Sequence, residues 1–244
     1  MKKIAVVIPS YNNCQWYKNN LSSLYNQDYD NFRAIYIDDC SSDGTGELVE
    51  KFIADNNLTK RIQLICNPVQ VGALENLYNV IYSCDDDEII VLLDGDDWFA
   101  HNGVLKRLNA VYSDSNCWLT YGQYISWPYN TPGYSRQIPS HIIEANKFRE
   151  YEWCASHLRS FYTWLFKMIK KEDLISPYGT FYPMAWDQAI MFPMLEMAGP
   201  RAKFITDVLY IYNEANPIND SKMNRQLQRH LEMIIRLQRK YDRL

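Results

Sequence analysis

The densest group of side chains able to do chemistry is the run LLDGDDW at 92–98, which contains Asp94, Asp96 and Asp97. Three carboxylates this close repel one another unless a cation or hydrogen-bond donors offset their charge. Hard oxygen ligands suit Mg²⁺ or Mn²⁺, and an ion with few protein ligands completes its shell with water and the phosphates of a nucleotide. The run therefore predicts a divalent-metal site. The alternative is a solvated acidic turn in which Asp97 caps a helix.

Three more polar loops carry side chains suited to a nucleoside. Tyr11 offers a ring on which a base could stack. Asp39 offers a carboxylate that accepts hydrogen bonds from a uracil N–H or from ribose hydroxyls, and Gly72 lets a ligand approach the backbone closely. Taken alone, each loop also fits an ordinary turn or a helix cap. The loops are PSYNN at 9–13, DDCSSDGT at 38–45 and NPVQVG at 67–72, the last of which opens with Asn67 and leads to Asn76.

The second half of the chain adds charged groups at positions that could face a substrate. Asp187 follows Trp186 at the start of an amphipathic stretch, so a carboxylate stands beside an aromatic ring. Arg159 could clamp a diphosphate, and His157 could donate a further hydrogen bond. The structural alternatives are Asp187 as a first-turn carboxylate that interacts with the helix dipole, and His157 as a packed structural side chain.

The elements that must position these residues alternate in the first half of the chain. Short, uniformly apolar runs are typical of strands covered on both faces of a parallel sheet, and the amphipathic stretches between them are long enough for right-handed crossovers. Because ligands of such sheets gather at the carboxyl ends of the strands, the four polar loops should meet at one edge. The apolar runs are 4–8, 34–37, 61–65 and 88–93, and the amphipathic stretches are 14–26, 43–56 and 70–83.

The second half is less regular. The segment 127–140, with three prolines and one glycine, predicts a long loop that is either substrate-facing or a plain surface excursion. From about 219 the chain is helical and basic, and it either packs on the domain or lies on a membrane surface. Its apolar stripe comprises Met223, Leu227, Leu231 and Ile234. The other predicted elements are helices at 102–113, 157–171 and 184–198 and strands at 117–125 and 208–212.

The composition of the chain excludes some classes of protein. The 244 residues carry 25 Lys and Arg against 29 Asp and Glu, a formal net charge of −4, so no global positive field favours nucleic acid as a partner. The six cysteines show no zinc-ligand or disulfide spacing and are expected to be reduced thiols. The N-terminal apolar run is too short for a signal peptide, and no window matches a membrane span, which predicts a cytoplasmic protein.

In order and kind, the four loops resemble the nucleotide-sugar-binding half of the family 2 glycosyltransferases, closely over residues 3–114 and more weakly to about 213. The resemblance implies the GT-A fold, the α/β, Rossmann-like fold of nucleotide-diphospho-sugar transferases, with a mostly parallel central sheet and C-terminal helices. It implies one domain over 1–218, with a nucleotide-sugar-binding half at 1–114 and an acceptor half at 115–218. The amphipathic basic helix at 219–244 would follow.

The same resemblance implies roles for individual residues. Asp94 would contact the ribose, Asp96 would bind the metal and Asp97 would support them. Asp187 matches the general base, and Trp186, which stands where the family commonly has a second acidic residue, would contact the acceptor. The family's late histidine ligand has no counterpart here, because the corresponding run ends in asparagine, so the third metal ligand is unassigned. The donor site would further include Pro9, Tyr11, Asp39, Asn67 and Gly72 around the nucleoside and His157 and Arg159 against the phosphates.

The expected function is that of a metal-dependent, inverting glycosyltransferase of the hexosyl-transferring type, in polysaccharide or glycoconjugate biosynthesis. Mn²⁺ or Mg²⁺ would be the cofactor, a UDP-sugar the donor, and a hydroxyl of a glycan, lipid-linked or protein acceptor the nucleophile. A non-catalytic nucleotide- or sugar-binding module is one alternative, kept open by Trp186. A nucleotidyltransferase is another, but it predicts a basic, glycine-rich loop that PSYNN lacks. Peripheral membrane contact through the 219–244 helix is the open alternative to a purely cytoplasmic location.

Overall fold

The computed structural model describes residues 1–244, apart from the side chains of residues 220 and 221. Its first half alternates strands and helices, as the sequence predicts. Every residue of the first strand is buried, which is what a strand covered on both faces requires. The elements are β1 (Ile4–Ser10), α1 (Tyr17–Tyr25), β2 (Phe32–Asp38), α2 (Thr45–Asp55), β3 (Ile62–Cys66), α3 (Ala73–Tyr82) and β4 (Ile89–Leu92).

The second half mixes short strands, short helices and one long returning strand. Its α-helices and strands are β5 (Trp98–Phe99), α4 (Val104–Val111), β6 (Leu119–Trp127), β7 (Thr131–Pro132), α5 (Ser140–Glu144), β8 (Ser160–Tyr162), α6 (Thr163–Lys167), α7 (Trp186–Ala198), β9 (Ala202–Asn213), α8 (Asp220–Met223) and α9 (Arg225–Leu237). Three 3₁₀ turns join them, η1 (Phe148–Glu150), η2 (Lys171–Leu174) and η3 (Gly199–Arg201).

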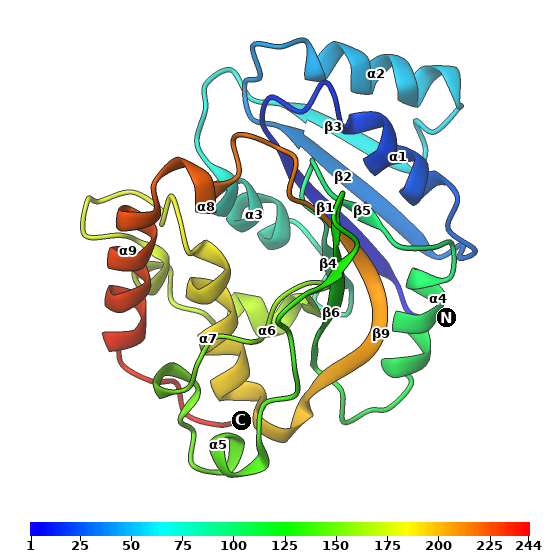
Figure 1. The fold of residues 1–244 in the computed structure, drawn as a ribbon. Coiled ribbons are helices and arrows are strands. Elements are labelled where there is room, and N and C mark those ends of the chain that lie inside the picture. The colour runs from blue at the N-terminus through cyan, green and yellow to red at the C-terminus, as the bar shows by residue number, and fades with distance from the viewer.

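The strands form one curved sheet in the order β3-β2-β1-β4-β8-β6-β9-β5, with β7 paired to β6 (Figure 1). The ladders between β1, β2, β3 and β4 and between β6 and β9 are parallel and contain most of the paired positions, whereas β8 and β5 pair antiparallel with their neighbours. The predicted α/β fold with a mostly parallel central sheet is confirmed.

The position of β8 decides what lies beside the end of β4. This short strand pairs antiparallel with β4 on one side and with β6 on the other. At its start, the backbone N–H of Leu92 donates to the carbonyl of Arg159 at 3.1 Å. The insertion of β8 therefore brings residues 157–159 against the acidic run 94–97, although residues 97 and 157 are 60 positions apart in the sequence.

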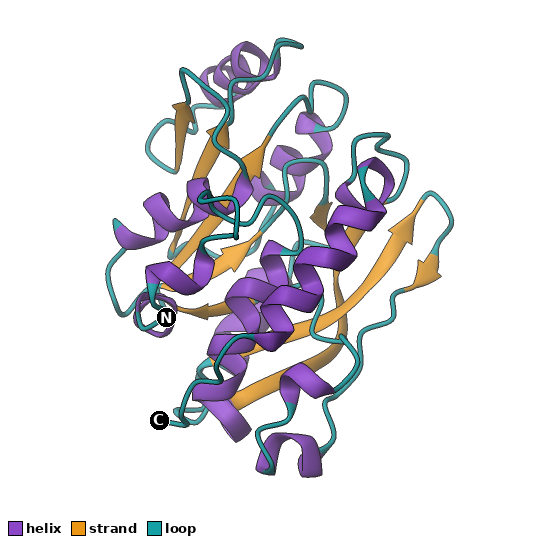
Figure 2. Cartoon of the chain, turned by 90° about the vertical axis from the view of Figure 1, so that its left-hand side faces the viewer, coloured by secondary structure: helices purple, strands orange, loops and turns teal.

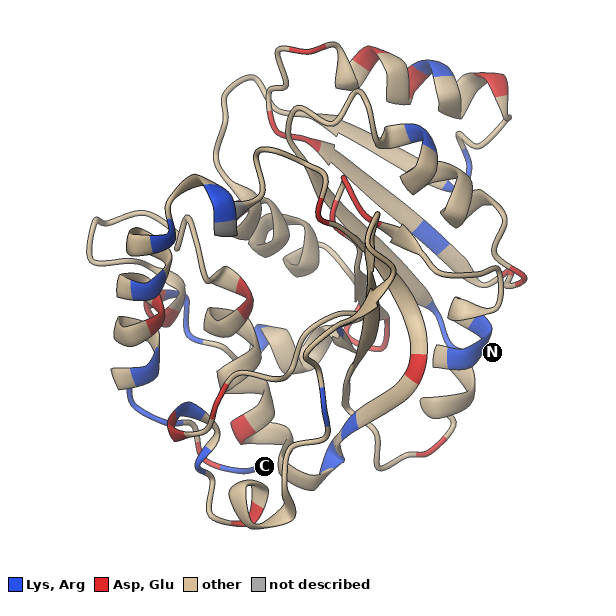
Figure 3. Cartoon of the chain, in the orientation of Figure 1, with Lys and Arg blue, Asp and Glu red and all other residues tan. Residues whose placement is uncertain are grey.

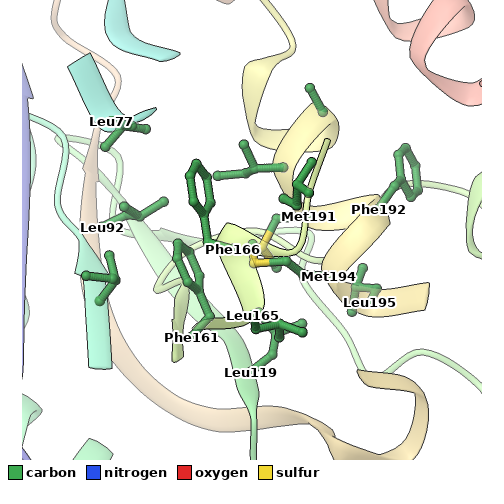
Figure 4. Packing of buried hydrophobic residues seen from close by; sticks show 14 of the residues in the cluster. Leu77, Leu92, Leu119, Phe161, Leu165, Phe166, Met191, Phe192, Met194 and Leu195 are labelled. Atoms are coloured by element: carbon green, nitrogen blue, oxygen red, sulfur yellow. The ribbon is translucent and has the colours of Figure 1, made fainter. Parts of the chain in front are cut away.

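Helices cover both faces of the sheet and enclose two apolar cores. One core lies against α1, α2 and α4. The other packs α3, α6, α7 and α9 on the opposite face, where Figure 2 shows helices lying across the sheet. Figure 4 shows its centre, in which side chains from α3, β4, β8, α6 and α7 pack together, among them Leu77, Leu92, Phe161, Phe166 and Met191.

The predicted helix at 157–171 is wrong over its first half. Residues 160–162 form β8, and only Thr163–Lys167 are helical. Ser160 explains the difference, because its hydroxyl lies 2.6 Å from that of Thr120 and 3.0 Å from that of Tyr112 inside the sheet. Such pairing is available only once β4 and β6 are in place, so tertiary contacts override the local helical pattern.

The predicted loop at 127–140 is partly structured. Its first residues turn back as β7, which pairs with the end of β6 through Ile125 with Pro132 and Ser126 with Thr131. The short α5 then begins at Ser140. The prolines do not prevent this hairpin, because a strand at the edge of a sheet tolerates a missing N–H.

The C-terminal segment is divided and folded back on the domain. Asn224 separates α8 from α9, and its side chain caps α9 by accepting from the N–H of Leu227 at 3.0 Å. Leu231 and Ile235 are buried in the core beside α7, so the apolar side of the helix packs on the domain. The basic residues of α9 are arginines, of which Arg225 and Arg229 are exposed, and Figure 3 shows basic residues along this helix. Among the described helices, none is long and apolar enough to cross a membrane.

Candidate active site

A pocket of about 710 Å³ opens at the carboxyl ends of β1, β2 and β4, between the strand-end loops and the start of α7. This is the edge at which the sequence places the polar loops. Among the predicted site residues, Asn67 is the one outside the pocket lining. The predicted residues that line it are Pro9, Tyr11, Asp39, Gly72, Asp94, Asp96, His157, Arg159, Trp186 and Asp187.

Asp39 lines one end of the pocket, and hydrogen bonds from neighbouring residues hold its carboxylate in place. Its Oδ1 accepts from Asn67 Nδ2 at 2.7 Å and from the Val71 N–H at 3.0 Å, and its Oδ2 accepts from the Gly72 N–H at 2.8 Å. Gly72 has φ +92°, a conformation that favours glycine. Burial alone raises the pKa of Asp39, but hydrogen bonds from Val71, Asn76, Asn67 and Gly72 outweigh it and hold the pKa below its usual value. Asn67 therefore positions the ionised Asp39.

The acidic run is not a solvated turn. Asp97 is 0% exposed, and its carboxylate accepts from the Tyr210 hydroxyl at 2.7 Å and from the Asn213 N–H at 2.6 Å. Burial, followed by the charges of Asp96 and Asp94, raises the pKa of Asp97 well above its usual value. Asp97 thus supports the loop from inside, whereas Asp94 and Asp96 retain partial exposure in the pocket.

Gly95 lets the acidic run pack against the first loop. A Cβ at this position would lie 2.5 Å from both the Cβ and the Oγ of Ser10, closer than atoms can approach. The N–H of Gly95 donates to the carbonyl of Pro9 at 3.0 Å. From the other side, Asn20 of α1 donates its amide to the carbonyls of Asp94 and Asp97 at 2.9 and 2.8 Å. The sequence gives no local signal for Asn20, which lies on a helix far from the run.

Arg159 and Asp187 meet on the opposite wall of the pocket. Arg159 Nη2 lies 2.9 Å from Asp187 Oδ2, and the guanidinium lies 5.9 Å from the ring centre of Trp186. Burial lowers the pKa of Arg159, but the charges of Asp187 and Asp94 outweigh it and raise the pKa, so the group stays charged. The residue predicted to contact the phosphates, Arg159, therefore forms an ion pair with the predicted base, Asp187. This ion pair orients the Asp187 carboxylate at the start of α7.

His157 borders the pocket beside Asp94, but its side chain is largely buried. Its ring stacks on Tyr210 with centroids 4.5 Å apart and an angle of 12°, and its Nδ1 lies 3.9 Å from Asp94 Oδ2. Burial, followed by the charge of Arg159, lowers the pKa of His157 well below its usual value. The imidazole is therefore neutral at neutral pH, and Arg159 supplies the positive charge of this segment.

The carboxylates and the imidazole make a donor set that fits a hard divalent cation. Ligand atoms of Asp94, Asp97 and His157 all lie within 4.8 Å of one another. Asp97, however, already accepts two hydrogen bonds and is 0% exposed, although it borders the pocket. Asp96 lines the pocket, and its Oδ2 accepts from Asn216 Nδ2 at 2.7 Å. The carboxylate oxygens of Asp94 and Asp96 therefore match the preference of Mn²⁺ or Mg²⁺.

The end of β9 and the segment after it contribute residues that sequence reasoning missed. Asn213 Nδ2 donates to the carbonyl of Asp96 at 3.1 Å. Asn216 Nδ2 donates to Asp96 Oδ2, and Lys222 Nζ donates to the carbonyls of Glu214 and Asn216, so this segment is held against the acidic run. Nothing in the local sequence identifies these side chains, because they reach the site only through the parallel pairing of β9 with β6. Asn76, which follows the third polar loop in the sequence, also lines the pocket, and further unpredicted lining residues are Gln70, Tyr124, Tyr134, Tyr212 and Gln228.

Solved structures share the fold of this chain. Staphylococcus aureus TarS, residues 1–349 in complex with UDP-GlcNAc, aligns with a TM-score of 0.63 over 87% of this chain and 58% of that chain, at 17% identity. The mannosyltransferase PcManGT from Pyrobaculum calidifontis, in complex with GDP-Man and Mn²⁺, gives a TM-score of 0.59 over 89% of this chain and 58% of that chain, at 18% identity. At these identities the likeness shows the fold, and it confirms the expected GT-A architecture.

Sequence comparison gives the family. A glycosyltransferase of Haemophilus influenzae, itself uncharacterized, is 29% identical over 124 residues, which are 51% of this chain and 48% of that protein. The poly(ribitol-phosphate) beta-N-acetylglucosaminyltransferase TarS of S. aureus is 34% identical over 100 residues, 40% of this chain and 17% of that protein. The aligned regions thus span half or less of these two relatives. The sequence pattern of glycosyl transferase family 2 matches residues 5–176, more than half of the chain, and the protein therefore belongs to this family.

Proposed function

We propose that the protein is a nucleotide-sugar glycosyltransferase that inverts the configuration at the anomeric carbon and uses a UDP-sugar as its donor. One observation carries the proposal. The braced carboxylate of Asp39, the acidic pair Asp94 and Asp96, and the Arg159–Asp187 pair all border a single pocket. Sugar transfer from such a donor needs three features in one site: a contact for the nucleoside, a place for the diphosphate and a base on the acceptor side.

The nucleotide would lie across the strand ends. Asp39 is ionised and can accept an N–H from the base, and Tyr11 at the pocket wall can stack on it. Asp94 would accept hydrogen bonds from the ribose hydroxyls. The family match and the TarS complex with UDP-GlcNAc support UDP as the nucleotide, whereas the GDP-Man complex of PcManGT makes guanine the alternative that experiment must compare.

Asp96 would hold Mn²⁺ or Mg²⁺, with Asp94 beside it. When bound, such an ion supplies positive charge that stabilises a leaving diphosphate. Arg159 is the permanent cation of the pocket, and it would add to this charge while holding Asp187 in place. Asp97 and Asn67 would not touch the donor. Asp97 would support Asp96, and Asn67 would support Asp39.

Transfer would be a single displacement. Asp187 would take the proton from an acceptor hydroxyl as its oxygen attacks the anomeric carbon. The bond from that carbon to the phosphate oxygen breaks on the opposite face, and the nucleoside diphosphate leaves with the bonding electron pair. Because attack and departure are on opposite faces, the product has inverted configuration, and no covalent sugar–enzyme intermediate forms.

The acceptor would approach past Trp186 and Tyr134, which line the pocket beside Asp187. An indole ring can pack on the apolar face of a sugar. The proposal takes residues 1–218 as one catalytic domain, with the acceptor half at 115–218, and takes a hydroxyl of a glycan, lipid-linked or protein acceptor as the nucleophile. Contact with a membrane would have to use the exposed basic side of α9, because Leu231 and Ile235 are packed on the domain.

The test is thermal unfolding against UDP, GDP and their sugar conjugates, each with and without Mn²⁺. A ligand that binds the folded state raises the midpoint by mass action. We expect a metal-dependent rise with UDP that is larger for one UDP-sugar and is lost in Asp96→Ala. Asp207→Ala, a surface variant in a pair with Arg107, is the control and should keep the rise. No rise with any nucleotide would refute the donor site.

A non-catalytic binding module is the second candidate. The observation that favours it is the Arg159–Asp187 pair, since Asp187 Oδ2 already accepts a hydrogen bond from Arg159 and is not free to accept one from an acceptor hydroxyl. The two candidates differ in turnover. Release of UDP from the donor, with or without transfer to an acceptor, supports the enzyme, whereas tight donor binding without any release supports the module.

A further inference from the structure

Tyr210 of β9 lies directly behind the acidic run and joins its first and last residues. It stands 116 positions from Asp94 in the sequence and is 0% exposed. Its hydroxyl accepts from the Asp94 N–H at 3.2 Å and lies 2.7 Å from Asp97 Oδ2 and 3.3 Å from Asp94 Oδ2. A hydroxyl has one proton, so it donates to the nearer carboxylate, that of Asp97. The same oxygen thus fixes the backbone of Asp94 and the side chain of Asp97.

The ring of Tyr210 has little freedom to move. It stacks on His157, and the backbone around it is part of the sheet, with Phe99 opposite Tyr210 in the antiparallel ladder between β5 and β9. Burial, followed by the charges of Asp94 and Asp97, raises the pKa of Tyr210 well above its usual value, so the hydroxyl keeps its proton. A rigid donor therefore faces a loop whose like charges would otherwise push its residues apart.

We propose that Tyr210 is a positioning residue, which clamps Asp94 to Asp97 so that the carboxylates of Asp94 and Asp96 face the donor in a fixed arrangement. This role rests on the proposed donor site, but the clamp itself is a property of the unliganded protein. Tyr210 does not have to touch the donor, because it acts through Asp94 and Asp97. The same clamp explains why Asp97 is buried although its charge is costly there.

Tyr210→Phe tests the clamp, because it removes the hydroxyl and keeps the ring that stacks on His157. Tyr121→Phe is the matched control. The Tyr121 hydroxyl is also buried and also accepts from a backbone N–H, that of Ile138 at 3.0 Å, but Tyr121 lies outside the pocket lining. Both variants lose one buried hydroxyl, so a general loss of stability should be similar in the two.

Two measurements are made on the whole chain. In the unliganded protein, amide hydrogen exchange of residues 94–97 should be about tenfold faster in Tyr210→Phe than in wild type, the equivalent of one lost hydrogen bond, and unchanged in Tyr121→Phe. The dissociation constant of UDP in the presence of Mn²⁺ should also rise by about tenfold in Tyr210→Phe alone.

The outcomes separate the two proposals. Exchange and UDP binding in Tyr210→Phe that match Tyr121→Phe would overturn the clamp. Faster exchange with unchanged UDP affinity would show a structural contact and would overturn the positioning role. If wild type binds no UDP, the proposed donor fails, and the exchange measurement still decides whether Tyr210 holds the acidic run.

Discussion

At the scale of single residues, the pairing of Asp187 with Arg159 is the feature that most directly links geometry to chemistry. The carboxylate is partly exposed to the pocket, whereas the guanidinium is buried behind it. The proposed base, held in this way, would keep one orientation toward an incoming hydroxyl, and such positioning contributes to general base catalysis. The ring of Trp186 lies against the guanidinium of Arg159 and lines the pocket beside Asp187.

Asp187→Asn separates basicity from positioning, because asparagine can still accept the hydrogen bond from Arg159. We expect transfer to fall by about 100-fold or more, the usual contribution of a general base, with the donor dissociation constant unchanged. Sugar transfer and donor binding are measured on the same preparation, and Asp207→Asn at the surface is the control. Near-wild-type transfer by Asp187→Asn would remove Asp187 from the role of base.

At the scale of elements, the start of β4 depends on an ion pair. Glu88 accepts from Arg33 Nε and Nη2 of β2 at 2.9 and 2.8 Å, and from the N–H of Asp85 at 2.9 Å. The hydrogen bond from Arg33 is the main cause that lowers the pKa of Glu88 below its usual value, against the opposing effect of burial. This contact fixes where β4 enters the sheet, and with it the position of the acidic run at its far end.

Glu88→Gln should therefore lower the free energy of unfolding in a pH-dependent way. A carboxyl whose pKa is depressed in the folded state stabilises the protein above its unfolded-state pKa, and this stabilisation is lost as the pH falls through the folded-state pKa. The difference between wild type and Glu88→Gln should thus be largest at neutral pH and shrink below about pH 4.3, the usual pKa of a glutamate. Denaturant titrations at several pH values measure it, and a difference independent of pH would contradict the assignment.

At the scale of the whole molecule, a buried pair ties the C-terminal segment to the domain. Arg149 donates to both carboxylate oxygens of Glu196 in α7 at 2.6 and 3.0 Å and also to the carbonyl of Ile235 in α9. The N–H of Tyr241 donates to Glu196 as well, at 3.0 Å. These bonds lie outside the pocket lining, so they stabilise the fold without taking part in the site.

Glu196→Gln should consequently separate stability from donor binding. It leaves the charge of Arg149 buried without its partner, which costs about 3–5 kcal/mol. The dissociation constant for UDP should be unchanged at a temperature where the variant is still folded. Chemical denaturation and calorimetric titration measure the two quantities. Glu150→Gln, in an exposed pair with Lys240, should change neither, and weakened UDP binding in Glu196→Gln would show that the C-terminal segment shapes the pocket.

The sequence by itself determined the parallel half of the fold and most of the pocket. Uniformly apolar runs separated by amphipathic stretches have few arrangements open to them, and in a parallel sheet the ends of such strands lie at one edge. Asp39, Asp94 and Asp96 could therefore be placed together before any coordinates were known. Each of them lies in the loop that follows a strand, within four residues of the strand's end, so its position depends on local order alone.

Only the tertiary structure decided how those residues are held. Tyr210, Asn213 and Asn20 brace the acidic run from other elements, and no local pattern connects them to it. The strand β8 replaced a predicted helix because its partners exist only after the sheet has formed. Hydrogen bonds between distant residues depend on strand register and on packing, which short-range periodicity in the sequence does not encode. The order of strands and loops, in contrast, follows directly from the order of the apolar and polar runs along the chain.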